Sequence, residues 1–588
     1  MDNKSKSLKE TFIEAYKKYQ IKDFKNAESI CYKILNIDPN HINSFSLLAT
    51  IAAFRKDFNS AKELLLKVIK IDPKNVSAYN NLGASYKELR KYDEAINSYN
   101  KILKINPKHV NAHYNLGLIY YNLKNLEKAK NYFQKTAEMQ SNYGLAFFSL
   151  GNVYVDLKEY EKAISSYQKA IEINPNIIGA HNNLGLTFRI LNDLENAIKC
   201  YEEAISRKPD HAGTHHNLGL ALKEIGKFDK AIISHQEAIK YEPNNTAHYF
   251  YLSELKKDIL DKKLRNKIEE ILKNKNTKKI GHAYGNYILA KFERNSKNYE
   301  KELNFLKEGH KNFFESNIKK FKLGIKYCFE DVLQVSEGAK IDGSEKKYKV
   351  KPIFIIGVPR CGSTLIEKII ASGKKNIPMG EEVAVLENFF NKKVIEKQSL
   401  NLGNVEIIRN ELYEIYKGKG LLSEKYQYNF TDKSLNNFFY LELIKLIYPE
   451  AKIINCKRDI LSSIMSIFQN NLTELAWTHD LQNIFKYFDN YINIVENFDE
   501  AYPNYIYHLS YEKLVENPEE ESKKVMKYCN LDWDKKCLEF YKRKDLISKT
   551  TSNIQIRRAI YKDSINKYDA YKKLLKEYGS KYSWFNLK

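Results

Sequence analysis

The pattern that most constrains the fold of this 588-residue chain is a period of 34 residues in its N-terminal half. Prolines, alanines and glycines all recur in phase at this spacing, apart from a serine where the fourth proline is due. The series comprise Pro39, Pro73, Pro107, Pro175, Pro209 and Pro243, the alanines from Ala27 to Ala231, and the glycines from Gly83 to Gly219. A fixed period of this length predicts one supersecondary unit that is repeated along a solenoid.

Each repeated unit is predicted to be a hairpin of two helices. Gly and Ala are expected where the helices approach too closely for larger side chains, and Pro where the second helix ends. Phrases such as AYNNLGASYKELRKYDEAINSYNKILKINP resemble the tetratricopeptide repeat. The resemblance implies about seven repeats over residues 8–244 and a groove that takes an acceptor or a protein partner.

Residues 245–345 keep helical periodicity but lose the 34-residue register. Segments such as LRNKIEEILKNK are typical of amphipathic helices, so we expect a helical connector that caps the solenoid. The polar run QVSEGAKIDGSEKKYK (334–349) marks its end. A further domain is predicted over residues 346–588.

The cysteine pattern and the lack of long apolar runs argue against a metal-binding, secreted or membrane-spanning protein. The cysteines form no CxxC pair and have no His partner at metal-ligand spacing, so we expect no metal site and a reducing compartment. The N-terminal segment has no apolar core, and no apolar run reaches the ~20 residues that span a bilayer, so we expect a cytoplasmic protein. The net charge of +23 favours anionic partners without choosing among nucleic acid, lipid and phosphorylated cofactors.

The segment KPIFIIGVPRCGSTLIEKII (351–370) predicts an anion site. IFII is typical of a strand buried on both faces, and LIEKII has helical spacing, so a glycine loop leads into a helix N-terminus. Gly357 and Gly362 have the separation of a Walker A loop, GxxxxGK[ST]. However, Ser363 and Thr364 follow without the lysine, which argues against ATP chemistry, and Arg360 could supply the positive charge instead.

The run GVPRCGSTL is similar to the 5′-phosphosulfate loop of sulfotransferases that use 3′-phosphoadenosine-5′-phosphosulfate (PAPS). It most resembles the tyrosylprotein sulfotransferases and the bacterial sulfotransferases that are joined to tetratricopeptide repeats. The resemblance implies a P-loop-like, three-layer α/β domain with a central parallel sheet after the α-solenoid. The residues implied to hold the sulfate-bearing end of PAPS are Arg360, Cys361, Gly362, Ser363 and Thr364.

A Gly-Glu-Glu motif follows this loop at Gly380, Glu381 and Glu382, one residue further along than in the tyrosylprotein enzymes. The resemblance implies that Glu382 is the general base, which takes the proton of the acceptor hydroxyl. Glu381 is the reserve candidate, because a shift of one residue would exchange the two.

The segment AKIINCKRDILSSIMSIFQNN (451–471) predicts a buried strand followed by a helix. Arg458 and Ser466 are eight residues apart, as in the family's 3′-phosphate site. A dianionic phosphate requires a permanent cation with bidentate donors and a hydroxyl. Asn470 replaces an arginine that the tyrosylprotein enzymes carry there.

Four further residues match the family through their surrounding segments. Lys433 in FTDKS falls on the transition-state lysine, and Tyr511 in SYEKLVENP falls on the tyrosine that packs at the nucleotide. Ser552 in TTSNIQIR matches a second transition-state stabiliser, and Lys567 a cofactor contact. The implied catalytic set is therefore Glu382, Lys433, Ser552 and Arg360.

The sequence predicts a sulfotransferase that releases 3′,5′-ADP, with no metal, no nucleic-acid partner and no membrane span. The acceptor is left open among a protein tyrosine, a glycan and a small molecule. One alternative is a repeat scaffold whose sulfotransferase-like domain is inactive. Another is a P-loop enzyme that uses a nucleoside triphosphate.

Overall fold

The computed structural model describes residues 2–343, 347–374, 377–397, 399–423, 428–543, 560 and 568–586. Contacts divide the chain into two units, Met1–Ala221 and Leu222–Lys588. Within these described ranges no helix is both long and apolar enough to cross a bilayer.

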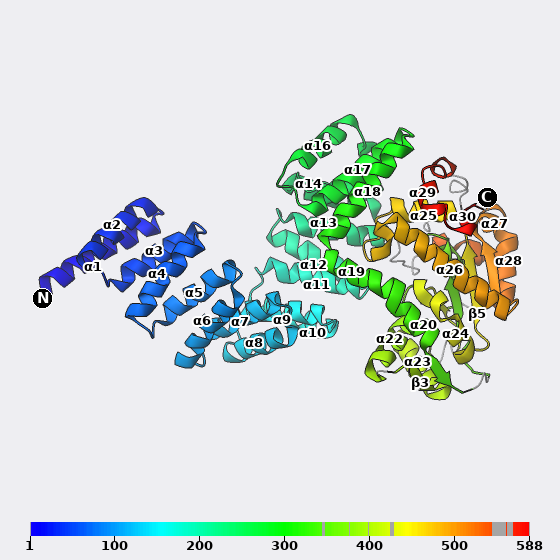
Figure 1. Cartoon of the computed structure of the whole chain (residues 1–588), viewed down its shortest axis with the longest axis horizontal. Coiled ribbons are helices and arrows are strands. Elements are labelled where there is room, and N and C mark those ends of the chain that lie inside the picture. Colours follow the sequence, from blue (N-terminus) through cyan, green and yellow to red (C-terminus); the bar gives the residue numbers. More distant parts are fainter. Residues whose placement is uncertain are drawn as a thin grey trace. The chain divides into compact units, whose positions relative to one another are not determined.

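The first unit is built from successive helix pairs (Figure 1). Its helices are α1 (Asp2–Gln20), α2 (Phe24–Ile37), α3 (Ile42–Phe54), α4 (Phe58–Ile71), α5 (Val76–Glu88), α6 (Tyr92–Ile105), α7 (Val110–Asn122), α8 (Leu126–Met139), α9 (Gly144–Asp156), α10 (Tyr160–Ile173), α11 (Ile178–Ile190), α12 (Leu194–Arg207) and α13 (Ala212–Glu224). The division between the units falls within α13, before the predicted end of the repeats. The repetition of hairpins confirms the predicted solenoid.

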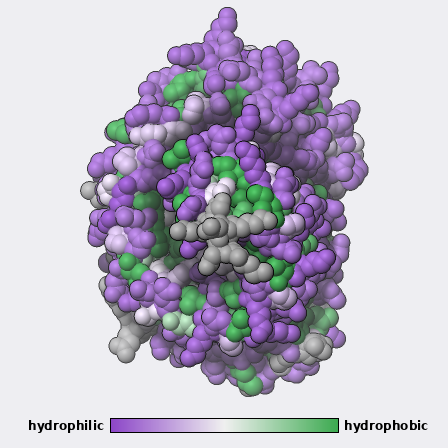
Figure 2. Space-filling model, turned by 90° about the vertical axis from the view of Figure 1, so that its left-hand side faces the viewer, coloured by the Kyte–Doolittle hydropathy of each residue, from purple (hydrophilic) through white to green (hydrophobic). Residues whose placement is uncertain are grey.

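The in-phase glycines lie where paired helices meet. An ideal Cβ at Gly151 in α9 would lie 2.4 Å from Cε1 of Tyr167 in α10, and Gly83, Gly117 and Gly185 meet an aromatic ring in the same way. The in-phase alanines, such as Ala163, are fully buried. Close helix approach therefore explains both series. The side of the molecule shown in Figure 2 is mostly hydrophilic, with hydrophobic residues in small groups.

Gly151→Ala is expected to lower the free energy of unfolding by about 1–3 kcal/mol, because overpacking against Tyr167 outweighs the better helix propensity of alanine. Gly213→Ala in α13 is the matched control, since the nearest atom to its Cβ would be Cε1 of His211 at 3.5 Å. The control should be neutral or slightly stabilising. Urea unfolding of both variants measures the difference, and a Gly151→Ala variant as stable as the control would contradict this explanation.

The second unit begins with further helices and continues into an α/β domain. The first helices are α14 (Phe228–Tyr241), α15 (Thr246–Leu255), α16 (Lys262–Lys273), α17 (Lys279–Asn295), α18 (Tyr299–Ser316), α19 (Ile318–Lys326) and α20 (Val332–Gly338). Their buried residues, such as Phe250 and Leu306, share one hydrophobic core with the strands and helices that follow. The predicted connector therefore packs directly on the α/β domain.

The α/β domain is built on a parallel four-stranded sheet in the order β4-β2-β5-β6. The strands are β2 (Ile353–Ile356), β4 (Thr431–Asp432), β5 (Lys452–Lys457) and β6 (Ile506–Ser510), and a second parallel pair joins β1 (Lys340–Asp342) to β3 (Asn401–Asn404). All four side chains of β2 are buried, and because successive side chains point to opposite faces, both faces are covered. The predicted α/β fold with a parallel sheet is confirmed.

In this domain one or more helices follow each of the strands β2 to β6 along the chain. They are α21 (Ser363–Ala371), α22 (Val385–Lys397), α23 (Val405–Gly418), α24 (Leu441–Ile447), α25 (Ile460–Gln469), α26 (Leu481–Ala501), α27 (Tyr511–Glu516), α28 (Pro518–Tyr528), α29 (Lys576–Gly579) and α30 (Ser583–Asn586). Helix α25 begins after Asp459, whose side chain accepts a hydrogen bond from the Ser462 N–H and caps the helix.

Candidate active site

The predicted site residues follow the carboxyl ends of all four strands of the sheet. The glycine loop begins directly after β2, Lys433 follows β4, Arg458 follows β5 and Tyr511 is the first residue after β6. Since the strands are parallel, these ends meet at one edge of the sheet, where open α/β sheets bind their ligands.

The loop after β2 has an unusual backbone. Gly357, Arg360 and Gly362 have φ angles of +147°, +71° and +100°, all in the left-handed range. An ideal Cβ at Gly362 would lie only 2.4 Å from Cδ2 of Tyr511, so no larger residue fits there. Ser363 opens α21, so the positive end of the dipole of this nine-residue helix lies at the end of the loop. The loop can therefore receive an anion.

The residues predicted for the two ends of the nucleotide contact one another. Nη1 of Arg458 donates to the carbonyl oxygen of Arg360 at 2.9 Å, and Nε of Arg360 donates to the Ser466 hydroxyl at 3.1 Å. The Arg458 guanidinium lies 4.9 Å from the ring centroid of Tyr511. The fold thus gathers two arginines, a hydroxyl and an aromatic ring, which suit a phosphorylated nucleotide.

Cys361 is part of this loop. Its side chain is buried next to Cys456 at the end of β5. A hydrogen bond from the Cys456 thiol lowers the pKa of Cys361 and raises that of Cys456. A thiol buried against another thiol fits packing rather than nucleophilic attack on a substrate.

Glu382 and Lys433 form an ion pair. Nζ of Lys433 lies 2.9 Å from Oε1 of Glu382, and the side chains are 1% and 43% exposed, respectively. Burial disfavours the charged form of Lys433, but Glu382 and then Glu367 outweigh this effect, so the pKa of Lys433 is raised. The structure therefore pairs a buried cation with a carboxylate that solvent can reach.

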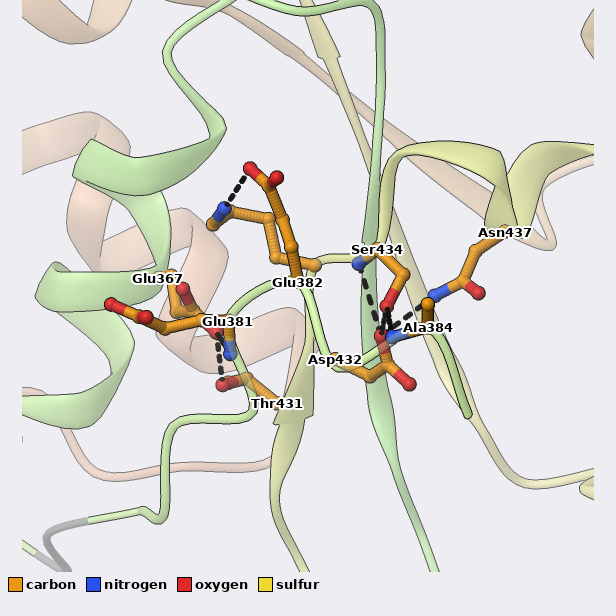
Figure 3. Close-up of polar contacts among 9 residues, drawn as sticks. Glu367, Glu381, Glu382, Ala384, Thr431, Asp432, Ser434 and Asn437 are labelled. Atoms are coloured by element: carbon orange, nitrogen blue, oxygen red, sulfur yellow. Dashed lines mark hydrogen bonds and ion pairs between the residues drawn. The ribbon is translucent and has the colours of Figure 1, made fainter. Parts of the chain in front are cut away.

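The segment before Glu382 is attached to the edge strand β4 (Figure 3). Gly380 N–H donates to the carbonyl oxygen of Thr431, and the N–H of Lys433 donates to the carbonyl oxygen of Glu381 at 2.8 Å. Oε1 of Glu367, from α21, accepts from Glu381 N–H at 2.9 Å and from the Thr431 hydroxyl at 2.7 Å. Burial raises the pKa of Glu367 to about 7, against the opposing charge of Lys433.

The segment after Glu382 is held by a second network (Figure 3). Ala384 N–H donates to the Ser434 hydroxyl at 2.8 Å, and this hydroxyl donates to Oδ1 of Asp432 at 2.6 Å. Asp432 is fully buried and also accepts from Asn437 Nδ2 at 2.9 Å and from the Tyr416 hydroxyl at 2.8 Å. Glu382 therefore lies between two anchored points.

Sequence reasoning missed Glu367, Thr431 and Asp432. The available signal for Glu367 was an acidic residue in LIEKII, the helical segment that directly follows the glycine loop. Ser552 and Lys567 lie outside the described residues, so their roles stay predictions.

The first helices of the second unit support the far end of α25. Nε2 of His310 in α18 lies 2.7 Å from the carbonyl oxygen of Phe468, and its Nδ1 lies 2.9 Å from Nδ1 of His479. Burial lowers the pKa of His310 to about 4, so it is neutral near pH 7. The buried carboxylate of Glu302 accepts from Gln469 Nε2 at 2.9 Å.

Comparisons with known proteins find matches in both the N-terminal and the C-terminal parts of the chain. A model of the sulfotransferase family matches residues 352–535. Models of the tetratricopeptide repeat match residues 42–75, 76–109, 110–143, 151–188, 185–226 and 212–245. The chain is therefore a tetratricopeptide-repeat protein that carries a domain of the sulfotransferase family, as the sequence predicted.

An uncharacterized protein of Aquifex aeolicus (strain VF5) is 28% identical over 325 residues, or 52% of this chain and 42% of that protein. The match thus spans less than half of that relative's length. Among solved structures, MamA is 28% identical with a TM-score of 0.26, covering 28% of this chain and 97% of MamA. YrrB, described as a TPR protein with an unusual peptide-binding site, is 23% identical with a TM-score of 0.28, covering 32% and 95%.

Proposed function

We propose that the C-terminal domain transfers a sulfuryl group from PAPS to an acceptor hydroxyl and releases 3′,5′-ADP. The family match supports sulfotransferase activity in general. The observation that carries the finer proposal is the meeting of the glycine loop, Arg458 and the Glu382–Lys433 pair at one edge of the sheet.

The residues present fit a nucleotide with phosphate groups at two ends. The glycine loop and the N-terminus of α21 would hold the 5′ end, because a glycine loop that leads into a helix N-terminus favours an anion. Arg458 and Ser466 would hold the 3′-phosphate, since they offer charge-assisted donors. By resemblance, Tyr511 would pack at the nucleotide and Lys567 would add a further contact.

The chain's own residues would then have distinct tasks. PAPS supplies the sulfuryl group, which passes to the acceptor oxygen as the bond to the 5′-phosphate oxygen breaks. Glu382 would take the proton of the acceptor hydroxyl, because its carboxylate is accessible and held by Lys433. Lys433, Arg360 and, by resemblance, Ser552 would neutralise the charge that develops on the leaving oxygen.

The acceptor we propose is the hydroxyl of a protein tyrosine, on the resemblance of GVPRCGSTL and the Gly-Glu-Glu motif to the tyrosylprotein enzymes. Tetratricopeptide repeats are protein-binding modules, so we propose that the repeats recruit the acceptor or a partner to the catalytic domain. A glycan or a small molecule is the alternative acceptor.

Thermal denaturation in the presence of nucleotides tests the donor. PAPS and 3′,5′-ADP should raise the Tm, with a stabilisation of about 2.7 kcal/mol at a hundredfold excess over Kd. ATP should raise the Tm much less, because it has no 3′-phosphate. A larger rise in Tm with ATP than with PAPS would favour the alternative of a P-loop enzyme that uses a nucleoside triphosphate. Transfer of radiolabelled sulfate from PAPS to tyrosine-containing peptides tests the reaction. Tight PAPS binding without transfer to peptides, glycans or phenols would favour the inactive scaffold.

A further inference from the structure

The loop that carries Glu382 adopts a backbone conformation that needs support. Glu381 and Ala384, on either side of it, have φ angles of +49° and +47°. Residues other than glycine rarely adopt this left-handed conformation, and they keep it only where surrounding contacts enforce it. The contacts on this loop are therefore expected to determine where Glu382 points.

Both main-chain polar groups of Glu381 are fixed by hydrogen bonds. Its N–H donates to Oε1 of Glu367 at 2.9 Å, and its carbonyl oxygen accepts from the N–H of Lys433 at 2.8 Å. These two bonds fix the peptide planes on both sides of Glu381. The direction of the next side chain follows from them, and Glu382 reaches Nζ of Lys433 at 2.9 Å.

Glu367 is a buried acidic residue of this network to which no role has been assigned. Its side chain is 1% exposed, and a buried carboxylate is costly unless it is hydrogen-bonded and paired. One oxygen, Oε1, accepts from both Glu381 N–H and the Thr431 hydroxyl, and Lys433 supplies a nearby positive charge (Figure 3). The hydrogen bonds of this carboxylate thus go to the loop of the proposed base and to the strand that precedes Lys433.

We propose that Glu367 is a positioning residue of this site. Its carboxylate oxygen holds the main chain of Glu381 so that Glu382 stays on Lys433 and is directed to the acceptor. The expected effect on the rate of sulfuryl transfer rests on the proposed function. The expected effect on the Glu382–Lys433 contact does not depend on that function. Displacement of a catalytic group by about 1 Å can lower a rate by about 10²-fold.

Two substitutions separate the hydrogen bonds of Glu367 from its bulk. Glu367→Met keeps a similar volume but has no acceptor oxygen, so kcat for sulfuryl transfer from PAPS to a phenol should fall by about 30- to 100-fold. Its Kd for 3′,5′-ADP should stay within about threefold, because the loop after β2 is untouched. Glu367→Gln keeps an oxygen that accepts both hydrogen bonds and should restore kcat to within about fivefold of the wild type.

A second pair of variants changes the donor of one of these hydrogen bonds, the Thr431 hydroxyl. Thr431→Val removes the hydroxyl that donates to Glu367, and Thr431→Ser retains it. The valine variant should lose about tenfold in kcat and the serine variant should stay near the wild type. This pair decides the question if Glu367→Met does not fold.

The positioning role is overturned if Glu367→Met keeps kcat within about threefold of the wild type, or if kcat and 3′,5′-ADP affinity fall together in Glu367→Met and Glu367→Gln alike. Crystal structures provide a readout that needs no reaction. The Glu382–Lys433 contact should persist in Glu367→Gln and be lost in Glu367→Met. If the wild type shows no transfer to any acceptor, the proposed function fails, and the retained or broken contact alone decides the role of Glu367.

Discussion

Glu382→Gln is expected to lower kcat by about 10²–10⁴, which is the usual contribution of a positioned general base. The amide keeps the shape of the carboxylate but cannot accept the proton of an attacking hydroxyl. Glu382 is suited to this role because its carboxylate is 43% exposed while its partner Lys433 is 1% exposed. Affinity for 3′,5′-ADP should change by less than about threefold, because no residue that would hold the nucleotide is altered.

Glu381→Gln is the matched control for this experiment. The network holds Glu381 through its main-chain N–H and carbonyl oxygen, which the substitution leaves in place. Its kcat should therefore stay within about tenfold of the wild type. Single-turnover rates with excess acceptor, together with calorimetric Kd values, measure both variants. Loss of turnover in Glu381→Gln alone would transfer the role of base to Glu381, and full activity in both would reject the mechanism.

Arg458→Ala is expected to weaken binding of 3′,5′-ADP by about 2–5 kcal/mol, because the 3′-phosphate loses a charge-assisted partner. Binding of 5′-AMP should weaken less, by about 0.5–1.5 kcal/mol, since Arg458 also donates one hydrogen bond to the carbonyl oxygen of Arg360 in the 5′ loop. Calorimetric Kd values for the two nucleotides measure both losses, and the loss for 3′,5′-ADP should exceed the loss for 5′-AMP.

Ser466→Ala is the control for the 3′ position. It removes one hydroxyl near the predicted phosphate site and should cost about 0.5–1.5 kcal/mol for 3′,5′-ADP and less for 5′-AMP. Its effect on Arg360 is limited to one hydrogen bond at 3.1 Å. Equal losses for both nucleotides in Arg458→Ala would show that this arginine does not recognise the 3′-phosphate.

Much of the fold could be predicted because its signals are local. IFII and AKIINC are continuous apolar runs, as buried parallel strands require, and they form β2 and most of β5. The 34-residue period reflects helix pairs that pack on their neighbours in sequence. By contrast, the amphipathic helices after residue 244 show only that one face is buried, so the core that they share with the sheet could not be predicted.

The residues of the candidate site also differ in whether their arrangement follows from local sequence or from the fold. Arg458 and Ser466 lie on one helix and its preceding turn, where spacing fixes their geometry. Glu367 acts through an N–H 14 residues away and a hydroxyl 64 residues away, and no local pattern encodes such bonds. Only the placement of α21 beside β4 and the loop of Glu381 brings these groups together.

The contacts at the C-terminal end of α25 link the proposed nucleotide site to helices that are distant in the sequence. Ser466 lies within it, and at its far end the Phe468 carbonyl oxygen contacts His310 while the Gln469 amide donates to Glu302. The coupling free energy between two sites acts equally in both directions. A change that strengthens these buried contacts is therefore expected to favour the conformation that binds the nucleotide, and a bound nucleotide is expected to make α18 harder to unfold. We therefore expect occupancy of the proposed nucleotide site to stabilise the helices between the repeats and the sheet.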